Sequence, residues 1–111
     1  MQFDLESGLH ILRRTPKALD ALLRELPDNW ARVTEGPDTW SAYDVVGHLI
    51  HGDETDWIPR ARVVLDYGPS KPFEPFDRFA QFEASRGKSL DQLLGEFAAV
   101  RARSLAELGE M

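Results

Sequence analysis

Leucines spaced alternately four and three residues apart constrain this 111-residue chain more than any other feature. This period places every member on one stripe of an α-helix, the kind of stripe that a helical bundle buries. Pro16 keeps the phase, so the spacing predicts one kinked helix over residues 5–26 that ends before Pro27. The series consists of Leu5, Leu9, Leu12, Pro16, Leu19, Leu23 and Leu26.

Two further segments have helical periodicity, and each begins with a capping box. Ser41 is followed by Asp44, and Ser89 by Gln92, at the spacing that lets side chain and backbone cap each other. These signals predict helices over residues 41–66 and 89–108, the first with a kink at Pro59. Residues 28–39 predict a connection between the first two helices.

Four phenylalanines repeat every third residue before the last predicted helix: Phe73, Phe76, Phe79 and Phe82. A short amphipathic helix over about residues 75–84 turns these rings onto the bundle, and a loop tethered by the aromatics is the alternative. We interpret the rings as core in preference to a ligand-stacking platform. No segment alternates with period two, so we expect no strand. The sequence predicts an all-α fold: a single domain over residues 1–111, an antiparallel bundle of three long helices and one short one.

Composition narrows the class of protein. A hydrophobic fraction of 42% is typical of a globular domain, and no apolar run is long enough to cross a membrane. A net charge of −6 opposes binding to nucleic acid or anionic lipid. The absence of cysteine excludes a disulfide framework and a thiolate metal site. We therefore expect a cytoplasmic protein with neither nucleic acid nor membrane as a partner.

The predicted second helix concentrates the residues that suit metal chemistry. At 100° per residue, with Asp44 at zero, His48 falls at about 40° and His51 at about −20°. Imidazole nitrogens bind borderline divalent metals, so the two histidines are candidate ligands. Their face is almost opposite the apolar stripe of the same helix, so the wheel by itself favours a solvated surface as the alternative to a ligand role.

Asp53 falls on the other side of this helix, at about 180° and within the apolar stripe. A buried carboxylate needs a polar partner. We expect a structural acceptor for an indole or for Arg60, with a catalytic base or an auxiliary metal ligand as the alternatives. Arg101 and Arg103, on the predicted last helix, are interpreted as surface bases.

The segment TWSAYDVVGHLIHGD, residues 39–53, resembles the second-helix signature of the DinB superfamily. That signature is a Trp followed by a Ser or Thr cap, then His-Leu and an acidic residue five positions after the histidine. The segments LRRTPKAL, residues 12–19, and DWIPRAR, residues 56–62, are similar to one branch of the same family. The resemblance covers about residues 5–108.

This resemblance implies a four-helix bundle in up-down-down-up order and a divalent metal, often nickel or zinc, held by three histidines. Some members are transferases or isomerases that depend on low-molecular-weight thiols. His48 matches the second-helix ligand, whereas the His-x-x-x-His pair of the family's last helix has no counterpart after His51. Either the chain is a member truncated at its C-terminus or the family's metal site has been lost. The metal-site candidates that remain are His48, His51 and Asp53.

Two functions follow from these observations. The first is a non-catalytic helical domain with a degenerate metal site. It forms a homodimer through the groove left by the missing fourth helix, lined by Leu, Val and Phe side chains of the second and last predicted helices. A two-fold contact fills two such grooves at once and brings His48 near its symmetry mate. A compact monomer in which the segment from Phe73 to Phe82 covers this groove is the alternative. The second is a divalent-metal-dependent enzyme of the thiol-dependent transferase or isomerase type that uses His48. The number of available ligands favours the first.

Overall fold

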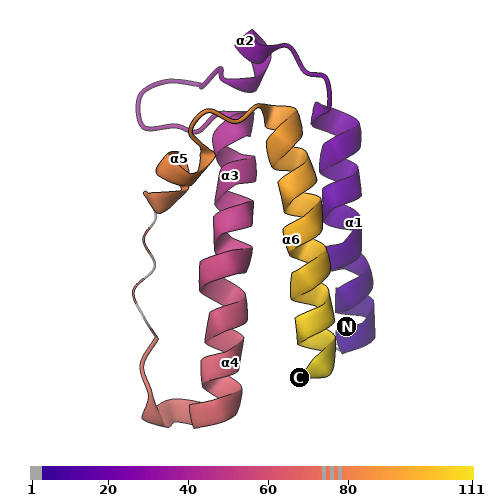
Figure 1. The fold of residues 1–111 in the computed structure, drawn as a ribbon, viewed down its shortest axis with the longest axis vertical. Helices are drawn as coiled ribbons and strands as arrows, with labels where there is room; N and C mark the ends of the chain where they lie inside the picture. The colour runs from indigo at the N-terminus through magenta and orange to yellow at the C-terminus, as the bar shows by residue number, and fades with distance from the viewer. Residues whose placement is uncertain (1–3, 74, 76, 78) are drawn as a thin grey trace.

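The computed structural model describes residues 4–73, 75, 77 and 79–111, and its secondary structure is helical (Figure 1). The described residues contain no strand, which confirms the predicted all-α fold. The elements in chain order are α1 (Leu5–Leu23), α2 (Asp28–Ala31), α3 (Ala42–Gly52), the π-helix η1 (Asp53–Trp57), α4 (Ile58–Tyr67), the 3-10 helix η2 (Gly68–Ser70), α5 (Ala80–Ser85) and α6 (Leu90–Glu110).

The long helices run up, down and down. Figure 1 shows α1 rising from the N-terminus, while the α3–η1–α4 rod and α6 both descend to the end where the chain finishes. α6 packs against α1 on one side and against α3 on the other. Since α4 and α6 descend in parallel, the chain returns along the outside of α3 before α6 begins, and α5 packs on α3 at the end of that return.

Both predicted capping boxes are present. Ser41 Oγ accepts a hydrogen bond from the backbone N–H of Asp44, and the Asp44 carboxylate accepts one from the N–H of Ser41. Ser89 and Gln92 repeat the arrangement at the start of α6. Each box satisfies two backbone donors that a helix start otherwise leaves without partners. The starts of α3 and α6 are therefore set by local sequence.

The first helix ends three residues earlier than predicted. α1 continues through Pro16 as expected but stops at Leu23, and Glu25 adopts a φ of 64°. The backbone N–H of Glu25 then donates to the carboxylate of Asp91 on α6, at 3.0 Å. A contact distant in sequence thus terminates the helix before Pro27 is reached. The predicted connection over residues 28–39 also contains a short helix, α2.

The second predicted helix is continuous in direction, but its middle changes type. A π-helical segment, Asp53–Trp57, precedes Pro59, which lies in the first turn of α4. Pro59 has no N–H for the hydrogen bond that an α-helix makes to the carbonyl four residues earlier. A π-bulge in place of the expected kink accommodates that lost donor and widens the turn that carries Asp53.

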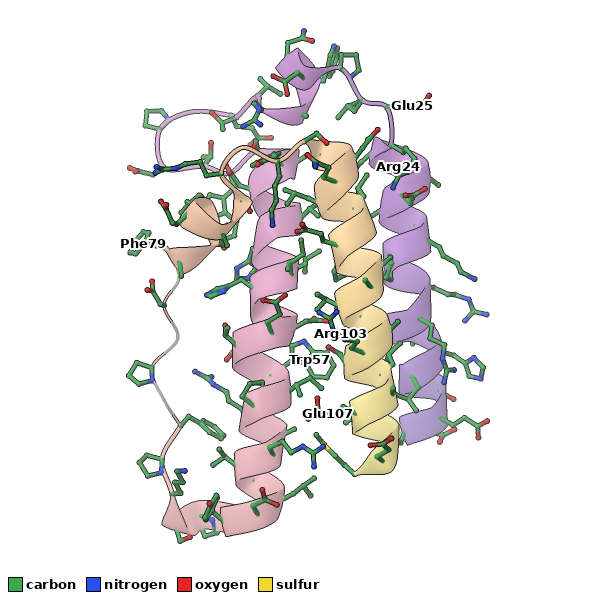
Figure 2. The ribbon with its side chains drawn as sticks, in the orientation of Figure 1. Arg24, Glu25, Trp57, Phe79, Arg103 and Glu107 are labelled. Atoms are coloured by element: carbon green, nitrogen blue, oxygen red, sulfur yellow. The ribbon has the colours of Figure 1, made fainter. Side chains whose placement is uncertain are left out.

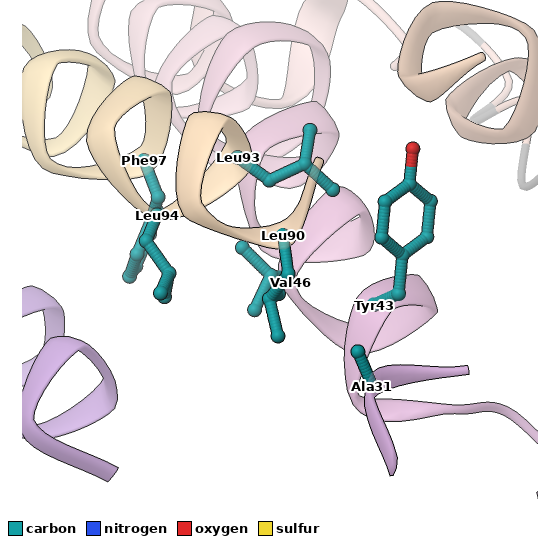
Figure 3. Packing of buried hydrophobic residues seen from close by; sticks show 7 residues of the cluster. All are labelled: Ala31, Tyr43, Val46, Leu90, Leu93, Leu94 and Phe97. Atoms are coloured by element: carbon teal, nitrogen blue, oxygen red, sulfur yellow. The ribbon is translucent and has the colours of Figure 1, made fainter. Parts of the chain in front are cut away.

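The core lies where α2 meets the starts of α3 and α6, at the upper end of the bundle in Figure 1, and Figure 3 shows its side chains from close by. Leucines of α1 and of the segment that follows it pack against this core but stay partly exposed, and no residue of α1 is buried. Seven residues form the buried cluster: Ala31, Tyr43, Val46, Leu90, Leu93, Leu94 and Phe97.

The phenylalanine series does not join the core, which corrects our interpretation of it. Phe73, Phe79 and Phe82 are all exposed, and Phe76 lies outside the described residues. The predicted short helix over residues 75–84 forms as α5, Ala80–Ser85. Its buried positions are polar, Gln81 and Ser85, because α5 packs on the polar side of α3. Among the described residues, no helix is both long and apolar enough to cross a membrane.

Candidate functional site

The candidate site lies where α5 crosses the polar face of α3. The close approach depends on Gly47, since a Cβ atom at this position would lie 2.7 Å from Ser85 Oγ. The hydroxyl of Tyr43 is shared between the carbonyl oxygens of Ser85 and Lys88, the latter at 2.8 Å. These contacts fix the end of α5 against the first turns of α3, so they also fix the side chains between the two helices.

Gln81 of α5 is almost completely buried and orients His48. The Gln81 side-chain amide donates from Nε2 to the backbone carbonyl of Asp44 at 3.0 Å, and its Oε1 lies 3.1 Å from His48 Nδ1. A carbonyl only accepts, so Nε2 must face Asp44 and Oε1 must face the imidazole. His48 therefore donates from Nδ1, and in its neutral form it carries the ring lone pair on Nε2. Trp40 packs against the same ring, with centroids 4.9 Å apart.

His51 is held by a different part of the chain. Its Nε2 lies 2.8 Å from the backbone carbonyl oxygen of Asp77, which obliges Nε2 to donate. One helical turn on, the Thr55 hydroxyl donates to the carbonyl of His51 at 2.7 Å. The helical wheel correctly placed both histidines away from the main core. The alternative of a solvated surface is wrong, however, because both side chains are half-buried beneath α5 and the segment before it.

Asp53 is not brought together with the histidines, because its carboxylate is directed to α6. Only 3% of Asp53 and 6% of Arg101 are exposed. Arg101 donates to both carboxylate oxygens, from Nε at 2.9 Å and from an Nη at 3.1 Å, and the indole of Trp57 donates at 2.7 Å. The other Arg101 Nη donates to the carbonyl of Leu12 on α1 at 3.1 Å. One buried ion pair thus joins α1, η1 and α6, and Figure 2 shows Trp57 on the side that faces α6.

One expectation for Asp53 is confirmed by the structure and another is wrong. Asp53 is a buried structural acceptor for an indole, as predicted, but the arginine is Arg101 and not Arg60, which pairs instead with Asp56 at 2.7 Å. The interpretation of Arg101 as a surface base is wrong. Its guanidinium lies 4.8 Å from the centroid of the Phe97 ring, within the apolar stripe of α6.

The described side chains do not by themselves fit a three-ligand metal centre. No group of three or more His, Asp or Glu residues in the described part of the chain is placed to hold a metal ion. His48 and His51 have different partners on the 77–81 segment, and both oxygens of Asp53 accept from Arg101. Gln81 and Arg101 are the residues that sequence reasoning missed. For Arg101 a signal existed, since it lies four residues after Phe97 and seven after Leu94 on the same stripe.

Comparison with known proteins identifies the family of this chain. A sequence profile described as the DinB superfamily matches residues 11–111. The match includes the Trp40–Ser41 cap, His48 and Asp53, on which the resemblance was based. A search of curated proteins finds no match.

Proposed function

Since the chain belongs to the DinB superfamily, we propose that it is a non-catalytic member that works as a helical association module, a homodimer formed through α1. The observation that carries this proposal is the exposure of a long amphipathic helix. α1 has 19 residues, none of which is buried, and it packs against α6. A helix in a bundle normally buries a stripe between two neighbours. The free side of α1 is therefore where a second copy fits.

That free side carries its own apolar stripe. Ile11 is 66% exposed and Leu22 is 74% exposed, and Ala18 between them is exposed as well. At 100° per residue, positions 11, 18 and 22 lie within about 40° of one another. They are distinct from Leu12, Leu19 and Leu23, which point about 100° further round the helix. Two apolar stripes on one surface helix leave one of them without a partner in the monomer.

The stripe has the symmetry that a two-fold contact requires. Ile11 and Leu22 lie about 16 Å apart along the helix axis, and the small side chain of Ala18 lies between them. When two copies of α1 meet in antiparallel orientation, Ile11 of each faces Leu22 of the other. A small residue near the centre lets the helix axes approach closely. The contact is self-complementary, so a second copy is a better occupant than an unrelated chain.

Sedimentation velocity at low micromolar concentration tests the proposal. We expect the wild-type chain to sediment as a species of twice its 12.6 kDa mass. The Ile11→Glu/Leu22→Glu variant should sediment at the mass of one chain while keeping its circular dichroism, since both side chains are exposed in the monomer. Val33→Glu, which places the same charge at an exposed apolar position outside α1, is the matched control and should remain a dimer. A wild-type monomer, or a dimeric double variant, would overturn the proposal.

The competing function, a divalent-metal-dependent enzyme in which His48 is a ligand, has one observation in its favour. The Gln81 amide accepts from Nδ1 of His48 and leaves the lone pair on Nε2. Histidines that bind metals are oriented in this way by an acceptor on their other nitrogen. The described residues supply too few further ligands for such a centre, and we therefore place this function second.

A further inference from the structure

A hollow of about 620 Å³ opens beside the candidate site, on a part of the molecule that the proposed dimer does not use. It lies between the loop that precedes α3 and the start of α5, and Asp38, Trp40, Phe79 and Phe82 line it. The three rings are 42%, 69% and 41% exposed, respectively. Figure 2 shows Phe79 at the outer edge of α5. Three large aromatic side chains on one hollow form an exposed apolar patch, which marks a binding surface.

The walls of this hollow are held in place by the surrounding structure. Trp40 and Phe82 stand nearly perpendicular, with ring centroids 6.3 Å apart and planes at 81°. Trp40 is packed on its neighbour His48. The Asp77 carboxylate accepts from the backbone N–H groups of Phe79 and Ala80, which fixes the turn that carries the Phe79 ring. A pre-formed site loses little conformational entropy when a ligand enters it.

The loop on the other side is equally constrained. The Thr39 hydroxyl donates to the carbonyl of Gly36 at 2.6 Å and accepts from the N–H of Glu35 at 3.1 Å. Asp38 lies within this turn with a φ of 62°. None of the ion pairs among the described residues uses the Asp38 carboxylate. One wall of the hollow therefore carries a negative charge that no described cation neutralises.

The aromatic rings of the hollow also differ from several other described rings, each of which has a cation over it. Phe73 has the guanidinium of Arg60 over its ring, Tyr67 has Lys71, and Tyr43 has Arg32. No described cation lies over Trp40, Phe79 or Phe82. The loop before α3 and the segment that carries α5 have two described basic residues, and both are paired: Arg32 with Asp28 and Arg86 with Glu83. The other described charged residues on these segments are acidic, and Arg78 lies outside the described residues.

We infer that this aromatic hollow binds a small alkylammonium ion, with a quaternary or tertiary nitrogen against the rings and Asp38 as its counter-charge. Several aromatic faces around one point attract a cation through their quadrupoles, and alkyl groups on the nitrogen lower the cost of desolvation. The volume is within the range of small-molecule sites. The net charge of −6 attracts a cation and repels an anion. A small cation is favoured over an anionic or purely apolar ligand because no cation among the described residues pairs with the Asp38 carboxylate.

Titration by NMR with choline, and with its neutral isostere 3,3-dimethylbutan-1-ol, tests this inference on the full chain. We expect saturable shifts confined to residues around the hollow, with choline binding at least five-fold more tightly than the alcohol. Phe79→Leu and Asp38→Asn should each weaken choline binding by about two- to five-fold, the size expected for one exposed cation–π or ionic contact. Phe73→Leu removes an exposed ring outside the hollow and should leave the affinity unchanged.

Three outcomes would overturn the inference. Equal binding of choline and the alcohol would show an apolar hollow without selectivity for charge. Shifts that do not saturate, or that Phe79→Leu leaves unchanged, would show no site at these residues. A trimethyl-lysine peptide that binds far more tightly than choline would identify a modified protein segment as the ligand instead. Because Phe79 and Asp38 are exposed, both variants should keep the wild-type circular dichroism, which separates loss of binding from loss of fold.

Discussion

Asparagine in place of Asp53 should destabilise the fold more than any change to a surface ion pair. Asp53→Asn conserves shape and removes one charge, so the guanidinium of Arg101 remains buried with no counter-ion. Removal of one partner from a buried pair costs about 3–5 kcal/mol. A domain of this size is stable by about 5–15 kcal/mol in total. The variant should therefore lose between a fifth and most of its stability.

Urea unfolding followed by circular dichroism measures this loss. With a slope of about 1.5 kcal/mol per molar urea, a cost of 3 kcal/mol lowers the midpoint by about 2 M. All variants must be compared at one protein concentration, because the stability of the dimer that we propose would depend on it. Glu107→Gln is the matched control. The Arg62–Glu107 ion pair also joins the α3–η1–α4 rod to α6, at 2.9 Å, but both of its side chains are at least 40% exposed. Its loss should be below about 1 kcal/mol.

A double variant separates the cost of an unpaired charge from the value of the pair. Asp53→Leu/Arg101→Met replaces both charges with apolar groups of similar size, and such exchanges are often neutral or stabilising. We expect this variant to recover most of the stability that Asp53→Asn loses, apart from about 1–3 kcal/mol for the Trp57 indole left without an acceptor. If Asp53→Asn shifts the midpoint no more than Glu107→Gln does, the description of a desolvated ion pair joining three elements is refuted.

Two other measurements check the packing of α5 and the number of metal ligands. Gly95→Ala should raise the free energy of unfolding by about 1 kcal/mol, because no described atom lies near a Cβ at this position. Gly47→Ala should instead lower the free energy of unfolding, because its Cβ meets Ser85, and equal effects of the two variants in urea unfolding would contradict the close packing of α5 on α3. Elemental analysis of tag-free protein after dialysis against zinc or nickel should find less than one metal per chain, and a full equivalent that is lost in His48→Ala would move the metal-dependent function into first place.

The elements that sequence reasoning located are those determined by neighbouring residues. The capping boxes at Ser41 and Ser89 use groups three residues apart, so the starts of α3 and α6 were predicted correctly. The end of α1 depends on Asp91, which is 66 positions from Glu25, and no local pattern contains that contact. The role of Gln81 was not predictable from local sequence either, because it depends on where α5 packs against α3.

The buried ion pair of Asp53 and Arg101 was only half predicted, although the sequence contained the information needed for both residues. Asp53 was recognised as buried because the wheel was applied to its helix, and the same construction places Arg101 within about 40° of Leu94 and Phe97. A buried charge on one helix requires an opposite charge on the helix that faces it. Only a basic residue on the apolar stripe of the last helix can meet this requirement. Arg101 lies on that stripe and Arg103 does not, so the sequence by itself favours Arg101 as the partner of Asp53.

Exposed apolar residues lie on several parts of this chain, and the two surfaces for which we propose partners differ in shape and chemistry. Burial of a large apolar side chain stabilises a protein by about 1.5–3 kcal/mol. Leu22 and Phe79 are both mostly exposed, so neither contributes that stabilisation in the monomer. The stripe on α1 is aliphatic and lies along one side of a helix, which suits a helix of a second copy. The hollow beside α5 is aromatic, concave and acidic, which suits a cation. Because the two surfaces differ in shape and chemistry and lie on different helices, the self-association that we propose at α1 would leave the hollow beside α5 open to the cation that we propose for it.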